Sequence, residues 1–118
     1  KKDVLLEESI PYIDLRPHPW RSLKTLGSAR QIPLIGNLPT LMKSILEYRS
    51  ENAFLFPRYN KKDVSYANSA SAAFNKWFKP MLPEKCVVHS FRHSFRDRLR
   101  AVECSSGIID AIGGWKTF

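Results

Sequence analysis

The sequence predicts an α+β fold that is mainly helical, with a small three-stranded antiparallel sheet near the N-terminus followed by about four helices. Residues 9–34 alternate apolar and polar side chains between turn-forming residues, as short strands do. After residue 37, apolar side chains recur at the spacings of three and four that are typical of helices with one buried face. With 118 residues, 43% of them hydrophobic, we expect a single domain over 1–118.

The expected strands lie on both sides of a proline-rich break. The stretch "IPYIDLRP" at 10–17 alternates apolar and polar residues, and "PHPW" at 17–20 interrupts it. The stretch "RSLKTLGSARQIPL" at 21–34 predicts two short strands around a turn at Gly27 and Ser28. Lys24 is therefore expected beside a hairpin turn.

Two helices are expected in the middle of the chain. Asn37 can cap a helix that ends near 49–52, with an apolar stripe made of Leu38, Leu41, Met42, Ile45 and Leu46. A short apolar piece and a basic loop over 53–65 follow. A second helix, ended by Pro80, has a stripe made of Ala67, Ala70, Phe74, Trp77 and Phe78.

Two further helices follow the connector at 79–85. The first has an apolar stripe made of Phe91, Phe95, Leu99 and Val102, with Arg92, Arg96 and Arg100 along a neighbouring face. The last is centred on Ile108, Ile109 and Ile112 and is expected to end at Gly113 and Gly114 in a left-handed cap.

The charge of the chain indicates a polyanionic partner. Nineteen Lys and Arg stand against eleven Asp and Glu, a formal net charge of +8, and a basic field of this kind attracts phosphates. The apolar runs are too short to cross a bilayer, and the first residues do not form a signal peptide, so no membrane is expected. Cys86 and Cys104 are expected to be free thiols in a reducing compartment.

The stretch "HSFRHSFRDRLR" at 89–100 contains the candidate functional residues. His89 and Arg92 are three residues apart and project together from the start of the expected helix. Free backbone N–H groups and the helix dipole favour an anion there. A guanidinium offers two donors to phosphate oxygens, and an imidazole can move a proton near neutral pH. The residues therefore predict a phosphate pocket.

Two other interpretations remain open on the residues alone. The first is a solvated basic helix whose histidines cap or pack, since charged stripes usually face water. The second is a zinc site made by Cys86, His89, His93 and Cys104. Structural zinc sites usually use two close pairs of ligands, and Cys104 stands alone, so no metal is predicted.

Two separated motifs resemble the tyrosine recombinases of the phage-integrase family. "HSFRHSFRDRLRAVECSSGIIDAIGGW" is similar to their H-x-x-R-H segment and the helix leading to a late His or Trp. "SLKTLGSARQIPL" is similar to their strand-hairpin-strand segment, which carries an active-site lysine. Lys24, His89, Arg92 and Trp115 match the functional positions, while His93 is assigned to packing or a local hydrogen bond.

The resemblance implies transesterification on DNA without a cofactor. A tyrosine would attack the phosphodiester and leave a 3'-phosphotyrosyl link and a free 5'-hydroxyl. Arg92 would bind a non-bridging oxygen, Lys24 would protonate the leaving oxygen, His89 would assist proton transfer, and Trp115 would pack on or hydrogen-bond the phosphate. Without the motifs, Lys24 would be read as an ordinary solvated lysine and Trp115 as a cover for the edge of the core.

Double-stranded DNA is the expected partner. Contacts to it are predicted for Arg30, Lys61, Lys62 and Arg96, as basic groups that can reach phosphates. The resemblance also implies a homo-tetramer on DNA for the full-length protein, a bacterial cytoplasmic or nucleoid location, and a phage, prophage or other mobile-element origin.

The family also uses an earlier arginine in an R-x-x-E setting and a tyrosine after the late His or Trp. Neither is found here, since Tyr12, Tyr48, Tyr59 and Tyr66 all precede the histidine motif. We therefore expect a partial catalytic domain, truncated at both ends and inactive by itself. Alternatives are a non-catalytic DNA-binding module, a small zinc-dependent nucleic-acid protein, a metal-dependent nuclease, which the scattered carboxylates disfavour, and the related chemistry of a type IB topoisomerase.

Overall fold

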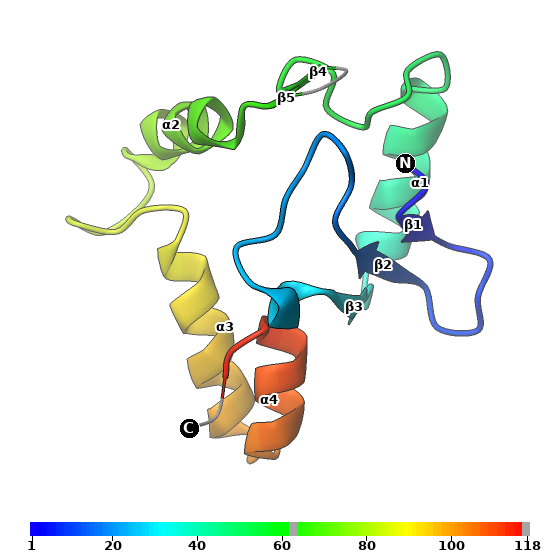
Figure 1. The fold of residues 1–118 in the computed structure, drawn as a ribbon. Helices are drawn as coiled ribbons and strands as arrows, with labels where there is room; N and C mark the ends of the chain where they lie inside the picture. The colour runs from blue at the N-terminus through cyan, green and yellow to red at the C-terminus, as the bar shows by residue number, and fades with distance from the viewer. Residues whose placement is uncertain (62–63, 117–118) are drawn as a thin grey trace. The chain divides into compact units, whose positions relative to one another are not determined.

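The structure, a computed structural model, describes residues 1–61 and 64–116. The chain forms two compact units, Lys1–Ser65 and Tyr66–Phe118. Both are drawn in Figure 1. The described residues contain a small antiparallel sheet, a short hairpin and four α-helices, which confirms the predicted α+β class with mainly helical content.

The N-terminal unit is built on a three-stranded antiparallel sheet with the order β1-β2-β3. The strands are β1 (Val4–Leu5), β2 (Tyr12–Leu15) and β3 (Arg30–Pro33). Strand β2 is central: Ile13 is opposite Val4 on one side and opposite Ile32 on the other. These β-branched pairs explain the register, because side chains directly opposite each other pack on one face of the sheet.

The number of strands in this sheet was predicted correctly, but one strand was assigned to the wrong segment. Residues 22–25 form no strand, and β1, which was not predicted, takes the third place in the sheet. After β2 the chain makes an isolated bridge between His18 and Arg21 and then a 3₁₀ turn, η1 (Leu26–Ser28). Strand β1 has only two residues, too few for alternation to reveal it in the sequence.

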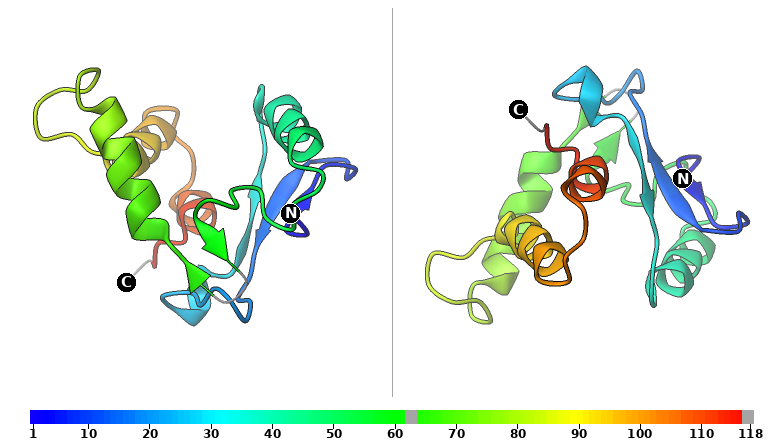
Figure 2. Two further views of the ribbon diagram at one scale, coloured as in Figure 1. Left: turned by 90° about the horizontal axis from the view of Figure 1, so that it is seen from above. Right: turned by 90° about the horizontal axis from the view of Figure 1, so that it is seen from below.

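Helix α1 (Leu38–Tyr48) lies beside the sheet in all views (Figures 1 and 2). Asn37 is at the N-cap position as predicted, but its side chain makes no capping hydrogen bond; a proline in the first turn suits the helix start instead. Leu34, just before α1, is buried, at 6% exposure. The stripe is only partly covered, because Leu38 and Leu41 stay exposed while Met42 is half-buried.

The loop that was expected over 53–65 contains a short hairpin of β4 (Asn60–Lys61) and β5 (Val64–Ser65). Two-residue strands are too short for alternation to reveal them in a sequence. The amide nitrogen of Asn60 donates to the backbone oxygen of Phe56 at 3.1 Å and closes the turn before β4.

The C-terminal unit contains α2 (Ala67–Phe78), α3 (Ser90–Ala101) and α4 (Ser106–Gly113). All three were predicted from their apolar spacing, and α3 and α4 lie side by side (Figures 1 and 2). Ile109 of α4 is 3% exposed. The rings of Phe78 and Phe91 meet edge to face at 5.6 Å, and Asn75 accepts the amide of Val88 at 2.7 Å, so α2 is tied to the start of α3.

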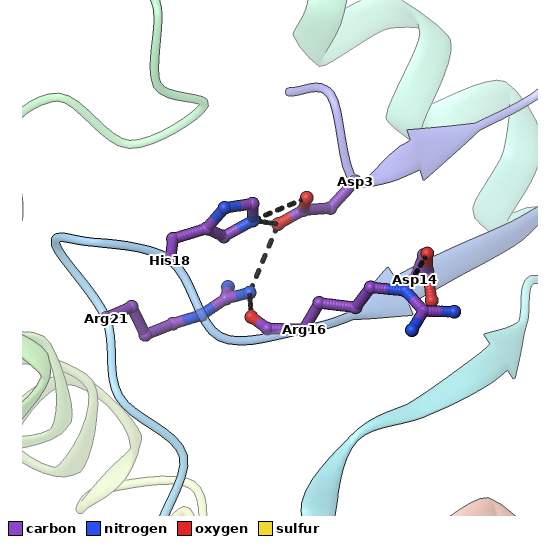
Figure 3. A network of polar contacts seen from close by, with 5 residues as sticks. All are labelled: Asp3, Asp14, Arg16, His18 and Arg21. Carbon is purple, nitrogen blue, oxygen red and sulfur yellow. Dashed lines mark hydrogen bonds and ion pairs between the residues drawn. The ribbon is translucent and has the colours of Figure 1, made fainter.

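A polar network in the N-terminal unit holds the segment that leads to Lys24 (Figure 3). The carboxylate of Asp3 contacts His18 Nε2 at 2.8 Å and accepts a hydrogen bond from Arg21 Nη2 at 3.1 Å. The same Arg21 nitrogen donates to the backbone oxygen of Arg16 at 2.6 Å. The His18 ring also stacks on Trp20, with the centroids 4.5 Å apart. The Asp3 carboxylate, directly before β1, thus contacts both residues of the His18–Arg21 bridge.

A second ion pair lies next to this network. Arg16 Nε donates to Asp14 at 2.6 Å, and this hydrogen bond together with the charge of Asp14 raises the pKa of the guanidinium above its ordinary value. The side chain of Arg16 is exposed, so the pair is open to water.

We predict that Asp3→Ala destabilises the N-terminal unit by about 1 kcal/mol, because it removes the shared partner of His18 and Arg21. Urea unfolding followed by circular dichroism measures the change. Glu8→Gln, which removes a carboxylate from an exposed position of the same unit, is the matched control and should leave the midpoint unchanged. Equal shifts of the urea midpoint in Asp3→Ala and Glu8→Gln would show that the stability of this unit responds to net charge and not to the contacts of Asp3.

No helix among the described residues is long and apolar enough to cross a membrane.

Candidate functional site

Helix α3 begins one residue after His89, which is at the N-cap position with helical backbone angles. Arg92 lies three residues further, and its backbone N–H donates to the His89 oxygen at 3.1 Å. Residues three apart at a helix start are neighbours on its surface, and the common projection of the imidazole and the guanidinium stays a prediction from this spacing.

The expectation of free backbone donors at this helix start is wrong. The amides of Ser90, Phe91 and Arg92 donate to the oxygens of the residues three positions before them, at 2.8, 3.1 and 3.1 Å. The preceding turn therefore uses the N–H groups that were expected to face an anion. We therefore expect side chains to make most of the contacts to an anion at the start of α3.

Arg92 lies over the indole of Trp115, with 4.2 Å between its Cζ and the ring centroid. This is well inside the range of a cation–π interaction. The stacked guanidinium has its orientation limited by the ring, while its edge remains available for hydrogen bonds to a planar pair of oxygens. The structure thus brings together two residues that are 23 positions apart in sequence and that the resemblance assigned to one site.

The backbone at the end of α4 places Trp115. Gly114 adopts the left-handed conformation with φ 64°, as predicted for a glycine cap. The carbonyl of Asp110 accepts the N–H groups of both Gly114 and Trp115, the latter at 3.0 Å. The chain therefore turns back sharply, and the indole that follows lies against the last turn of α4.

Gly113 leaves the space in which the indole lies. A Cβ built on Gly113 would be 1.7 Å from Cζ3 of Trp115 and 1.8 Å from its Cε3. No real contact is that short, so any side chain at 113 would displace the ring. Gly113 was missed as a site residue. The signal in the sequence was the pair of glycines directly before Trp115, and these glycines were interpreted only as a helix end.

Arg96 lies over the same indole at 5.0 Å, and its Nη2 is 3.9 Å from Asp110 Oδ1. The sequence predicted Arg96 as a DNA contact, and that role stays a prediction. Asp110 was not expected at the site at all, because a lone acidic residue on a short helix has no distinctive pattern.

The His89 ring meets the His93 ring edge to face, with 5.3 Å between centroids. This contact agrees with the assignment of His93 to packing. Cys86 and Cys104 are both free. Within 1–61 and 64–116, no group of three or more His, Cys, Asp or Glu side chains is arranged to hold a metal ion.

Lys24 belongs to the N-terminal unit, on an exposed bend before η1. It is not on a hairpin turn between two paired strands, so that part of the prediction is wrong. The bend follows the His18–Arg21 bridge in sequence by three residues. Because Lys24 and Arg92 lie in different units, their partnership stays a prediction.

The other predicted DNA contacts are also in the N-terminal unit. Arg30 is half-buried in β3 and donates through Nη1 to the oxygen of Ser28 at 2.8 Å. Lys61 is exposed in β4. Lys62 lies outside the described residues. The roles of these residues toward DNA remain predictions.

Comparison of the chain with protein-family models, with curated proteins and with solved structures found no match. The likeness to tyrosine recombinases therefore rests on the residues of the two motifs.

Proposed function

We propose that this chain is the phosphate-binding part of a site-specific DNA recombinase or integrase, which cuts and rejoins DNA through a 3'-phosphotyrosyl intermediate. Double-stranded DNA is the substrate, and a homo-tetramer of the full-length protein in a bacterial cytoplasm or nucleoid is the working assembly. No cofactor or metal is part of the proposal.

The observation that carries the proposal is the stacking of Arg92 on Trp115, one helical turn from His89. Three residue types that suit a phosphodiester are held by one unit: a guanidinium with fixed orientation, an indole with an N–H donor, and an imidazole. The net charge of +8 supports attraction to the DNA backbone.

The proposed reaction has two bond changes at one phosphorus. A tyrosine oxygen forms a bond to phosphorus as the bond to the 5'-oxygen breaks, and no external energy source is needed because one phosphodiester replaces another. Arg92 binds a non-bridging oxygen and offsets the charge that develops in the transition state. His89 assists removal of the tyrosine proton, and Lys24 gives a proton to the leaving 5'-oxygen.

None of the four tyrosines of these 118 residues follows Trp115, where the family has its nucleophile. The chain alone is therefore proposed to bind DNA without transferring strands. The net charge of +8 suits equally a second candidate function, a non-catalytic DNA-binding module with an integrase-like fold. In both cases the affinity should be largely independent of DNA sequence and should fall steeply with salt.

A covalent adduct separates the two candidates. The product of the complete gene is incubated with nicked DNA that carries its attachment site, and SDS-resistant protein–DNA complexes are measured. We expect an adduct with the unsubstituted protein and about 100-fold slower formation with Lys24→Ala or His89→Ala, the usual cost of losing an acid–base group. Salt-sensitive binding without any adduct would favour the non-catalytic module.

A further inference from the structure

Arg92 shares its indole with a second arginine that the proposed chemistry does not use. Arg96 lies one helical turn further along α3 and is 5.0 Å from the centre of the Trp115 ring. Two guanidiniums one turn apart repel each other, since like charges at this spacing are destabilising on a helix. A negatively charged group near Arg96 would offset this repulsion.

Asp110 provides that group. Its Oδ1 is 3.9 Å from Arg96 Nη2, and the Asp110 side chain is only 13% exposed, so its charge is less screened than on an open surface. The backbone carbonyl of the same residue accepts the N–H of Trp115 at 3.0 Å. The backbone at 110 therefore holds the chain at Trp115, and the Asp110 carboxylate faces the guanidinium that lies on the Trp115 ring.

Arg96 is also packed more than a DNA contact needs to be. Its Nε is buried and has no hydrogen-bond partner in the described part of the chain, and only 36% of the side chain is exposed. By contrast, Arg98 and Arg100 on the same helix are exposed. A partly buried arginine side chain whose guanidinium faces a carboxylate suits a residue that holds neighbouring side chains in place.

We propose that Arg96 and Asp110 are positioning residues, which hold the Trp115 indole and through it the guanidinium of Arg92. The Asp110 carboxylate offsets the positive charge of Arg96 and leaves Arg92 as the cation directed to phosphate. Its purpose rests on the proposed function, because Arg92 needs a fixed orientation only if it binds a phosphate.

A double-mutant cycle tests the inference. The affinity of the 118-residue chain for a short DNA duplex is measured for the unsubstituted chain, Arg96→Lys, Arg92→Ala and the double variant. Arg96→Lys keeps the charge but loses the planar group that stacks, so we expect it to weaken binding about three- to tenfold. With Arg92 already replaced, Arg96→Lys should have no further effect. Arg98→Lys is the matched control and should change nothing.

An equal loss in both backgrounds would overturn the inference, since it would mean that Arg96 contacts DNA directly. The indole N–H resonance of Trp115, assigned with Trp115→Phe, gives a readout that does not need DNA. It should move in Arg96→Lys and in Asp110→Asn and stay in place in Arg98→Lys. No movement in the first two variants would also overturn it. If the chain binds no DNA while the resonance moves, the proposed function fails and the positioning of Trp115 stands.

Discussion

Gly113→Ala is expected to destabilise the C-terminal unit, although alanine is the better helix former. Alanine in place of glycine normally stabilises a helix by up to about 1 kcal/mol. At 113, however, the added Cβ would overlap the Trp115 ring, at 1.7 Å from Cζ3. Overpacking of this kind typically costs about 1–3 kcal/mol, so the steric effect should exceed the gain in helix propensity. The free energy of unfolding, measured in urea, should therefore fall.

Gly107 gives a matched control in the same helix. A Cβ at Gly107 meets nothing within 4 Å, and the residue lies in the first turn of α4. Gly107→Ala should therefore stabilise the unit or leave it unchanged, opposite in sign to Gly113→Ala. If both substitutions stabilise the chain, the Trp115 ring does not lie against Gly113.

Arg92→Ala is expected to cause the largest loss of DNA affinity among substitutions on α3. We expect the dissociation constant for a short duplex to rise about tenfold, and the slope of its logarithm against log salt to fall by about 1, as for the loss of one phosphate contact. Arg92→Lys should retain the salt slope and lose part of the affinity, because an ammonium lacks the planar stacking on Trp115.

Arg100→Ala removes the same charge from the same helix at an exposed position, where the partner is Asp97 at 3.8 Å. It should weaken binding much less than Arg92→Ala. Fluorescence anisotropy at several salt concentrations measures all variants. Equal losses at 92 and 100 would mean that DNA responds to the total charge of α3 and that no phosphate site exists at its start.

The helices were predicted well because their apolar spacing is a local property. The stripe with Phe91 and Phe95 gives α3, and the two glycines after Ile112 give the end of α4. The strands were harder, because pairing in a sheet is not local. β1 has only two residues, and its place beside β2 depends on Ile13 and on the Asp3 network, which no short window of sequence reveals.

In the candidate site, too, local features were predicted and features that depend on the folded chain were not. His89 and Arg92 were found from residue type and spacing and Trp115 from the resemblance to the family motif, and in the structure Arg92 stacks on Trp115. Gly113 and Asp110 were missed, since their parts depend on where the indole lies after the chain turns back. The engaged amides at the start of α3 also could not be predicted, because they depend on the turn before the helix.

The most direct test of the central claim, that Arg92 offsets the charge of the scissile phosphate, is a rescue experiment with modified DNA. Once the cleaved position is mapped, one non-bridging oxygen there is replaced by a methyl group, which removes the negative charge. The complete gene product carrying Arg92→Ala should form little SDS-resistant adduct with ordinary DNA and should regain adduct formation with the neutral methylphosphonate. An Arg92→Ala protein that is equally defective on both DNAs would contradict the claim.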